Sequence, residues 1–309
     1  MSPQRRDVLT YGGVALATAL AGCSNDGDAD ADDPTDTPAG NGTDSPTPSG
    51  NMPSLADFET TALGEELSAE DVSVTLDEPS VRSSMLYETG EGDRSEYGLK
   101  ASSGTYYLLA TVEAGEGGPT PESFMLVTES NGNYLSADPV SGNPLRERGE
   151  RYDPENGATS GWVAFPAVGG VDYSNAAVVV DGTESGWELD SETLSALSNP
   201  VPSFSLDGVD APASVAPGSE FDLTVRFSND GETAGTARGV VWWSAPNRPM
   251  RPFAVDVAAG ETGEHTERFT ASSSGGESTY VVQTVAGNAE VTVTVGDGGN
   301  SSNGSENGS

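Results

Sequence analysis

Cysteine and histidine are the side chains that most often carry covalent or metal chemistry, and this sequence has one of each, Cys23 and His265. A single cysteine cannot close a disulfide within the chain. Structural zinc sites, iron-sulfur clusters and blue-copper sites each need several Cys or His ligands. The inventory therefore excludes these groups, and we expect no cofactor and no metal site.

Classical catalytic patterns are also missing from the sequence. A Ser-His-Asp arrangement would have to use His265, which lies in a predicted strand where alternate side chains face solvent. There is no Gly-x-Ser-x-Gly elbow, phosphate loop or Gly-x-Gly-x-x-Gly motif. Carboxylates are so frequent that no pair stands out as catalytic. We expect no catalytic residue and a protein that is not an enzyme.

Two groups of arginines stand out from an acidic background. The first group is Arg146, Arg148 and Arg151, within a predicted long loop of residues 138–157. Ordinary pairing with nearby acids such as Glu147 and Glu150 is the simpler interpretation of this cluster.

In the second group, Arg238, Arg248 and Arg251 bracket Trp242 and Trp243. Consecutive side chains of a strand point to opposite faces, so we expect one indole in the core and the other on the outer face. An outward indole needs cover, which one of these arginines or the preceding domain can supply. The functional alternative is a contact surface for a partner, because Trp and Arg are enriched where binding energy concentrates.

The segment that ends in Cys23 is typical of an export signal. Arg5 and Arg6 precede an apolar run over residues 11–21, about half the roughly 20 residues that a membrane-spanning helix needs. A positive start, a short apolar run and small residues are typical of a signal that is removed. The alternative is a short N-terminal helix with a buried cysteine, which the Gly12-Gly13 pair would weaken.

The four residues Leu20-Ala21-Gly22-Cys23 resemble the lipobox of prokaryotic lipoproteins, in which a lipid is attached to the cysteine thiol and cleavage occurs before it. This resemblance implies a mature chain that begins at Cys23 and is held by membrane lipid. Arg5 and Arg6 resemble the twin-arginine export signal, although several residues around them depart from its usual pattern.

Charge indicates the medium in which the protein works. The chain has 49 Asp and Glu against 13 Lys and Arg, a net charge of -36, and its one lysine is Lys100. Molar salt shortens the Debye length to about 3 Å and so screens most of this repulsion. Lysine scarcity, acidity and the lipobox together resemble exported lipoproteins of salt-loving archaea. Nucleic acid is excluded as a partner, because binding it needs a positive surface.

The sequence divides into six predicted segments. They are an export signal (1–22), a lipidated disordered tether (23–53), a first β-domain (54–198), a proline linker (199–202), a second β-domain (203–296) and a disordered tail (297–309). The tether and tail contain four candidate glycosylation sites, Asn41, Asn300, Asn303 and Asn307. Alternating aspartates in residues 26–33 lack the Gly and Glu of a calcium loop.

The first domain shows the alternation of half-buried strands. Val72, Val74 and Leu76 share one face, residues 106–112 repeat the pattern, and only residues 191–197 are predicted to be helical. A strand is also predicted over residues 81–87. The order of strands and the segment Gly161-Trp-Val-Ala-Phe-Pro166 resemble telokin-like extracellular domains. In that family the aromatic segment is structural.

The second domain has about seven short predicted strands, as expected for an immunoglobulin-like sandwich. The segments 215–221, 227–231 and 258–262 resemble the adhesion-related CARDB domain. That resemblance implies a surface module for spacing or contact, without catalytic residues.

The sequence as a whole predicts an all-β protein with two immunoglobulin-like sandwiches in series. We expect a non-catalytic binding, adhesion or spacer module on the outer face of the cell membrane. Its expected partners are membrane lipid and a cell-surface protein or glycan. The alternative is a solute-capturing receptor or an enzyme with a site in the loops of the first domain. A deep, closed pocket between loops would favour this alternative, whereas convex sandwiches without a pocket would favour a spacer module.

Overall fold

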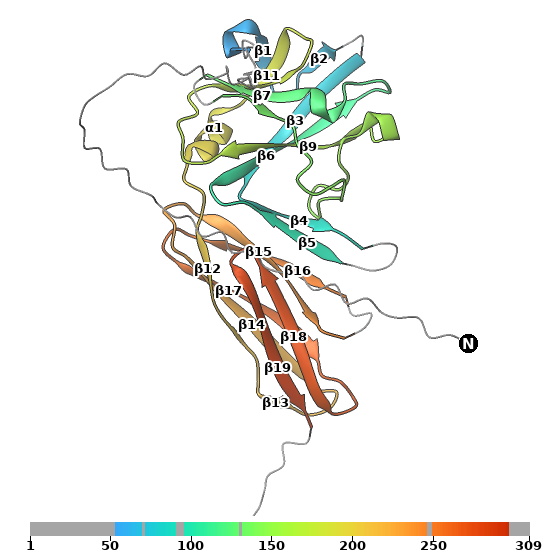
Figure 1. Ribbon diagram of the computed structural model, residues 1–309, viewed down its shortest axis with the longest axis vertical. Coiled ribbons are helices and arrows are strands. Elements are labelled where there is room, and N and C mark those ends of the chain that lie inside the picture. Colours follow the sequence, from blue (N-terminus) through green and yellow to red (C-terminus); the bar gives the residue numbers. More distant parts are fainter. Residues whose placement is uncertain (1–52, 70–71, 91–95, 130–131, 246–248, 297–309) are drawn as a thin grey trace, which may run out of the picture. The chain divides into compact units, whose positions relative to one another are not determined.

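The computed structural model describes residues 53–69, 72–90, 96–129, 132–245 and 249–296. These residues are mainly β-strands, with one α-helix, α1 (Ser191–Ser198), which confirms the all-β prediction (Figure 1). Several predicted features lie outside the described residues: Arg5, Arg6, Cys23, Arg248, the residue 26–33 run, and the candidate glycosylation sites Asn41, Asn300, Asn303 and Asn307.

The N-terminal β region, residues 53–198, contains two main sheets and a separate hairpin. One sheet has the order β1-β11-β10-β7-β8, the other has the order β2-β3-β6-β9, and β4 pairs with β5. The strands are β1 (Glu59–Ala62), β2 (Glu66–Ala69), β3 (Val72–Arg82), β4 (Ser84–Glu88), β5 (Tyr97–Ala101), β6 (Thr105–Ala114), β7 (Phe124–Thr128), β8 (Tyr134–Leu135), β9 (Ser160–Val168), β10 (Ala176–Val180) and β11 (Ser185–Glu188).

Several strands of this region are buried on both faces, which is why they read as continuous apolar runs. In β6, Leu108 belongs to the core between the two sheets, whereas Leu109 packs on the opposite side with Leu145 and Trp162. All five residues of β10 are buried in the same way. The sheet β2-β3-β6-β9 therefore has apolar cover on both sides, and the segment 136–159 supplies part of it.

Local sequence explains the single helix. The Asp190 carboxylate caps its start by accepting a hydrogen bond from the Thr193 amide at 2.7 Å. Leu197 is fully buried against the core of the N-terminal β region. The helix ends before Asn199, which has extended backbone as expected for a residue that precedes proline. The predicted helix over residues 191–197 is thus confirmed.

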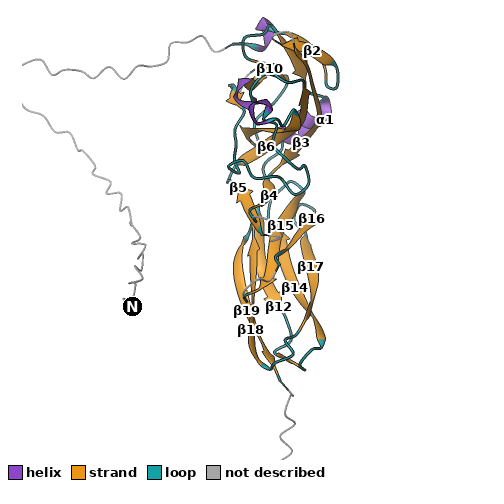
Figure 2. Cartoon of the chain, turned by 90° about the vertical axis from the view of Figure 1, so that its right-hand side faces the viewer, coloured by secondary structure: helices purple, strands orange, loops and turns teal. Residues whose placement is uncertain are grey.

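The C-terminal β region, residues 203–296, is a two-layer sandwich (Figure 2). Its sheets have the orders β12-β14-β17 and β13-β19-β18-β15-β16. Buried Leu223, Val225 and Phe227 alternate with less buried residues in β14 and face the shared core. The strands are β12 (Phe204–Asp210), β13 (Ser214–Val215), β14 (Glu220–Asn229), β15 (Gly235–Trp243), β16 (Arg251–Val257), β17 (Thr262–Thr270), β18 (Gly276–Thr284) and β19 (Gly287–Val295).

One predicted strand is wrong in its extent. Residues 81–87 do not form a single strand, because the chain leaves β3 after Arg82 and starts β4 at Ser84. The two strands belong to different sheets, with β3 next to β6 and β4 next to β5. The contacts of β15 with β4 and β5 join the two β regions. Within the described residues, no helix has the length and apolar character required to cross a membrane.

Candidate binding pocket held by arginines

A polar cavity of about 600 Å³ opens in the N-terminal β region, and we call it the Arg148 pocket. It lies where the segment 136–159 meets the strands of the sheet β2-β3-β6-β9. Its lining residues are Glu78, Pro79, Arg82, Thr111, Glu147, Arg148, Glu150, Ser160 and Gly161.

Apolar anchors fix the loop that forms one wall of the pocket. Val140 and Leu145 are buried with Trp162 on the outer side of the sheet. The Trp162 indole Nε1 also donates a hydrogen bond to the Gly149 carbonyl at 3.0 Å. A long loop is normally mobile, but these contacts hold residues 145–149 next to β9. The pocket wall is therefore set by packing as well as by polar contacts.

A β-bulge in β3 shapes the opposite wall. The pairing of β3 with β6 shifts register between Asp77 and Ser80. Within the bulge Glu78 has a φ of 49°, a left-handed conformation that costs free energy for a residue other than glycine. The Glu78 amide donates to the Asp77 carboxylate at 2.7 Å. Because of the bulge, the Glu78 carbonyl is free of the strand pairing and accepts a hydrogen bond from Arg148.

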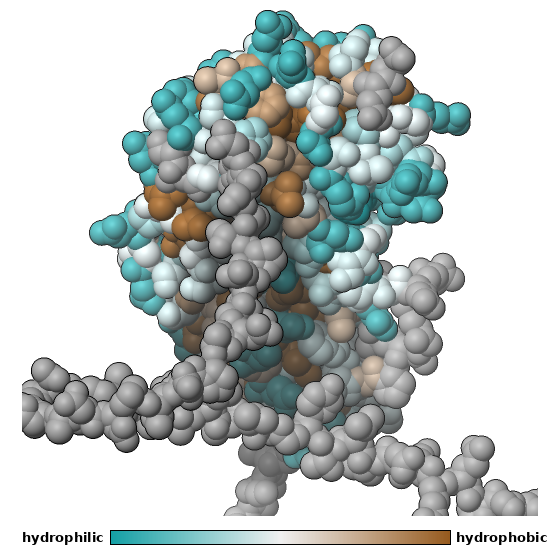
Figure 3. All heavy atoms as spheres, turned by 45° about the horizontal axis from the view of Figure 1, so that its top comes forward, coloured by the Kyte–Doolittle hydropathy of each residue, from teal (hydrophilic) through white to brown (hydrophobic). Residues whose placement is uncertain are grey.

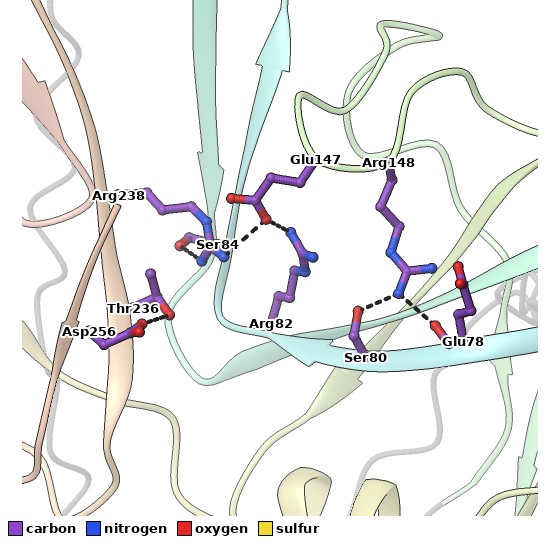
Figure 4. A network of polar contacts seen from close by, with 9 residues as sticks. All are labelled: Glu78, Ser80, Arg82, Ser84, Glu147, Arg148, Thr236, Arg238 and Asp256. Atoms are coloured by element: carbon purple, nitrogen blue, oxygen red, sulfur yellow. Dashed lines mark hydrogen bonds and ion pairs between the residues drawn. The ribbon is translucent and has the colours of Figure 1, made fainter. Parts of the chain in front are cut away.

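Arg148 is held by neutral oxygen atoms. Its guanidinium donates to the Glu78 carbonyl at 2.6 Å, to Ser80 Oγ at 3.0 Å and to Thr111 Oγ1 at 2.9 Å. Figure 4 shows the side chain reaching from the loop to the strand that carries Ser80 and Glu78. Burial and then the nearby charge of Arg82 lower the pKa of Arg148, and the charges of Glu78 and Glu147 offset this only in part. The side chain is nonetheless a cation at neutral pH, because arginine starts from a very high pKa.

Glu147 lies between two other arginines. Its carboxylate pairs with Arg82 and, at 3.6 Å, with Nη2 of Arg238 from β15 (Figure 4). Arg238 is 7 % exposed and also donates to Ser84 Oγ at 3.3 Å. Burial alone would raise the pKa of Glu147, but the charges of both arginines and their hydrogen bonds outweigh burial and lower it. Glu147 is therefore a charged link between the two β regions.

The predicted arginine cluster is divided by the structure. Arg148 lines the pocket, Arg151 pairs with Glu122 at 3.0 Å, and Arg146 is exposed and outside the lining. The pairing expected with Glu147 and Glu150 is wrong in its partners. Glu147 pairs with arginines from β3 and β15, which lie far away in the sequence.

The sequence gives no local signal for the partners of Arg148. Glu78, Ser80 and Thr111 are ordinary strand residues about 70 and 37 positions away, and they meet Arg148 through the β3–β6 pairing and a bulge. The unusual feature at this site is the left-handed backbone of Glu78. A bulge of this kind cannot be predicted from the types of the side chains.

The two tryptophans occupy opposite faces of β15. Trp243 packs against the sandwich core, with its ring 6.5 Å from the Tyr280 ring. Trp242 is half-buried on the face that also carries Val240 and Arg238. Val240 has no exposed surface although it lies outside the sandwich core, and β4 and β5 contact this strand. Part of the outer face is therefore covered by the N-terminal β region.

The expected stacking of arginine on an indole is wrong for Arg251. Its guanidinium lies 4.6 Å from the centre of the Phe269 ring and pairs with Glu267 at 2.6 Å. Arg238 points to Ser84 and Glu147 instead.

His265 lies in β17, as predicted. Its ring stacks on Phe253 at 4.3 Å with an interplanar angle of 7°, and its Nε2 lies 3.4 Å from the Glu267 carboxylate. In the part of the chain that the structure describes, no group of three or more His, Cys, Asp or Glu side chains is arranged to hold a metal ion.

Comparisons with known proteins give partial structural similarity. No protein-family model matches the chain, and no curated protein matches it. A β-glucosidase from Listeria innocua is similar with 16% identity, a TM-score of 0.27, and coverage of 32% of this chain and 16% of the enzyme. A β-glucosidase from Erythrobacter marinus has 18% identity, a TM-score of 0.27, and coverage of 31% of this chain and 16% of that one.

The CARDB domain of a Pyrococcus furiosus protein, solved in complex with di-metal ions, is also similar. Its identity is 14% and its TM-score 0.27, with coverage of 30% of this chain and 93% of the domain. At these values neither kind of neighbour speaks for an activity or a ligand of this chain.

Proposed function

We propose that the protein is a lipoprotein anchored through Cys23 on the outer face of the cell membrane. In this proposal its β regions act without catalysis, as a binding, adhesion or spacer module in high salt. The observation that carries the proposal is the single cysteine of the chain, which directly follows Leu20-Ala21-Gly22 after a short apolar run. A thiol that serves no disulfide is available for lipid attachment.

The folded part supports a role in contact or spacing. Two β regions with separate apolar cores are joined by contacts of β15 with β4 and by the Arg238–Glu147 ion pair. Where Figure 3 shows the described residues, hydrophilic and near-neutral side chains make up much of the visible face, with groups of apolar side chains between them. Such a surface suits a medium in which salt screens repulsion between carboxylates.

The Arg148 pocket supports a second candidate function, a receptor that captures a solute, although the pocket is open and not the deep, closed pocket expected of a receptor. Its volume of about 600 Å³ lies within the range of ligand sites, roughly 300–1,000 Å³. An anchored receptor and a surface module would both be located at the outer face of the membrane, so the lipobox is compatible with either. They differ in whether this pocket is occupied by a small ligand.

Replacement of Cys23 by Ser tests the anchor. We expect the variant to move from the membrane fraction to the soluble fraction, because the lipid on Cys23 is the proposed anchor. Its circular dichroism should match that of the wild-type protein. Fractionation after a wash in molar salt, together with mass spectrometry of the N-terminal peptide, measures both the location and the lipid.

A matched control for this experiment is Ser24→Ala, which changes the neighbouring residue and leaves the thiol in place. This control should stay with the membranes. If Cys23→Ser also sediments with membranes, the lipid anchor is refuted.

A further inference from the structure

We propose that the Arg148 pocket binds a small hydroxylated solute that carries a carboxylate group, with Arg148 as the residue that takes the carboxylate. This inference builds on the proposed binding role and assigns it a site and a ligand class. It does not depend on the lipid anchor.

Arg148 differs from the other arginines that are at least half-buried in its lack of a carboxylate partner; among the described residues only the exposed Arg146 also lacks one. Within the described residues, no carboxylate lies within ion-pair distance, 4.0 Å, of its guanidinium. Six other arginines each have such a partner: Arg82, Arg151, Arg226, Arg238, Arg251 and Arg268. A half-buried cation without a counter-ion is unusual in a chain with 49 acidic residues. The missing partner is what an anionic ligand would supply.

The guanidinium is also oriented before any ligand arrives. An arginine has five N–H donors in a fixed plane. Three contacts to Glu78, Ser80 and Thr111 fix the plane and use Nη1 and Nη2, which leaves Nε and the second hydrogen of Nη1 for a ligand. Oriented donors bind a carboxylate with a smaller loss of side-chain entropy.

The acidic side chains of the lining do not neutralise Arg148. Glu147 is engaged by Arg82 and Arg238. The Glu78 carboxylate accepts a hydrogen bond from Thr111 Oγ1 at 3.1 Å, and the same hydroxyl accepts from Arg148. Thr111 therefore stands between the Glu78 carboxylate and the guanidinium, so the charges of Glu78 and Glu147 act on Arg148 without a direct ion pair and offset only in part the lowering of its pKa by burial.

The remaining lining indicates the rest of the ligand. Glu78, Glu150 and Ser160 supply oxygen atoms that accept hydrogen bonds from hydroxyl groups, and few apolar side chains line the cavity. A ligand with several negative charges would be repelled by these carboxylates. One carboxylate together with several hydroxyl groups is the combination that satisfies both parts of the lining.

Two sugars that differ in one group test the proposal. D-Glucuronate and D-glucose are titrated into the full-length protein by calorimetry in molar KCl. We expect binding of glucuronate at least about tenfold tighter than binding of glucose, because one hydrogen bond to a charged group contributes about 1.5–3 kcal/mol and about 1.4 kcal/mol is tenfold. Equal affinities for the two sugars, or no heat with glucuronate, would overturn the proposal.

Matched variants locate the site. Arg148→Gln should weaken glucuronate binding about tenfold or more, whereas Arg146→Gln removes the same charge two residues away, outside the lining, and should leave binding unchanged. Equal losses in both variants would mean general electrostatic attraction and would refute the site.

Arg148 also anchors its loop, so a second variant addresses the pocket without removing the arginine. Ser160 is an exposed lining residue at the start of β9, and Ser160→Trp fills the cavity. Glucuronate binding should be lost while circular dichroism is retained. Retention of wild-type affinity would overturn the site. The membrane location of Cys23→Ser is measured separately, so failure here leaves the anchor result intact.

Discussion

The exposed arginines of the C-terminal β region and Arg148 of the N-terminal β region make different kinds of contact, and Arg238, buried where the two regions meet, is an exception within the C-terminal β region. In the C-terminal β region, arginines bridge neighbouring strands at exposed positions, as Arg226 does with Asp210 and Arg268 with Asp222. In the N-terminal β region, Arg148 ties a long loop to neutral oxygen atoms of β3 and β6. In the sheet β12-β14-β17, Arg226 and Arg268 lie on the solvent face, each paired with a carboxylate of a neighbouring strand. In the N-terminal β region, Arg148 lies between the long loop and the sheet. The polar groups that hold the loop there also line the Arg148 pocket.

The two β regions also differ in net charge. Residues 54–198 contain 27 acidic and 6 basic side chains, a net charge of -21, whereas residues 203–296 contain 12 acidic and 5 basic side chains, a net charge of -7. The N-terminal β region therefore has about twice the negative charge per residue. Repulsion between like charges opposes its compact state more strongly.

The largest expected effect is a difference in salt dependence. When salt falls from about 1 M to about 0.1 M, the Debye length grows from about 3 Å to about 10 Å, so more carboxylates repel one another. We expect the N-terminal β region to loosen first. Hydrogen exchange resolved by peptide measures protection in the two regions in one sample.

If both β regions lose protection from hydrogen exchange at the same salt concentration, the higher negative charge of the N-terminal β region does not make it more sensitive to salt. Sucrose at low ionic strength is the control, because it favours compact states without screening charge. At low salt, sucrose should leave the N-terminal β region less protected from hydrogen exchange than the C-terminal β region, because sucrose does not screen the charges.

The second effect concerns the tryptophans of β15. Trp243→Ala should lower the free energy of unfolding by about 2–4 kcal/mol, because the indole packs against the sandwich core and Tyr280. Trp242→Ala should cost less, within about 1 kcal/mol, if a binding partner rather than the fold uses this ring. Thermal and urea unfolding measure both variants. Equal and large losses would show that both rings serve the core.

The third effect compares a buried arginine with an exposed one. Arg238→Met should lower the free energy of unfolding by about 1–3 kcal/mol, since it removes the bond to Ser84 and one partner of Glu147. Arg226→Met is the matched control, because this side chain is half-exposed in its ion pairs and should change stability by at most about 1 kcal/mol. Similar losses in urea unfolding would mean that burial of the arginine does not decide its contribution to stability.

Much of the fold was predictable because alternation and turn residues are local signals. The strands of the C-terminal β region follow this rule, as Leu223, Val225 and Phe227 show. Short strands such as β1, β2 and β11 were missed, since four residues do not establish a period. Strand β10 is buried on both faces and shows no alternation, so only its continuous apolar run marks it as a strand in the sequence.

The candidate pocket was only partly predictable. The arginine cluster of the loop drew attention to Arg148, but its partners are set by the register of β3 against β6 and by the bulge at Glu78. Arg82 and Glu147 meet across 65 positions of sequence. Such contacts depend on tertiary structure, and residue types at local spacing do not encode them.

The smallest expected effect is a pH dependence at the link between the two regions. The pKa of Glu147 lies below its usual value of 4.5, because Arg82 and Arg238 outweigh the effect of burial, which alone would raise it. A carboxyl whose pKa is lowered by folding stabilises the folded state above its unfolded pKa, and this contribution is lost as the pH falls through the lowered value. In Glu147→Gln the contribution is absent at every pH. The difference in unfolding free energy between the wild type and Glu147→Gln should therefore shrink as the pH falls below about 4.5.

Glu150→Gln is the matched control for this measurement, because Glu150 has no ion pair among the described residues and lies three positions away in the same loop. Its stability should follow the wild-type profile from pH 7 to pH 3 in urea unfolding at constant molar salt. Constant salt matters, because protonation of the many surface carboxylates also relieves repulsion and acts on all three proteins alike. A difference between the wild type and Glu147→Gln that stays constant with pH would mean that Glu147 does not link the regions through its charge. The loop would then be held by Arg148 and its apolar anchors alone.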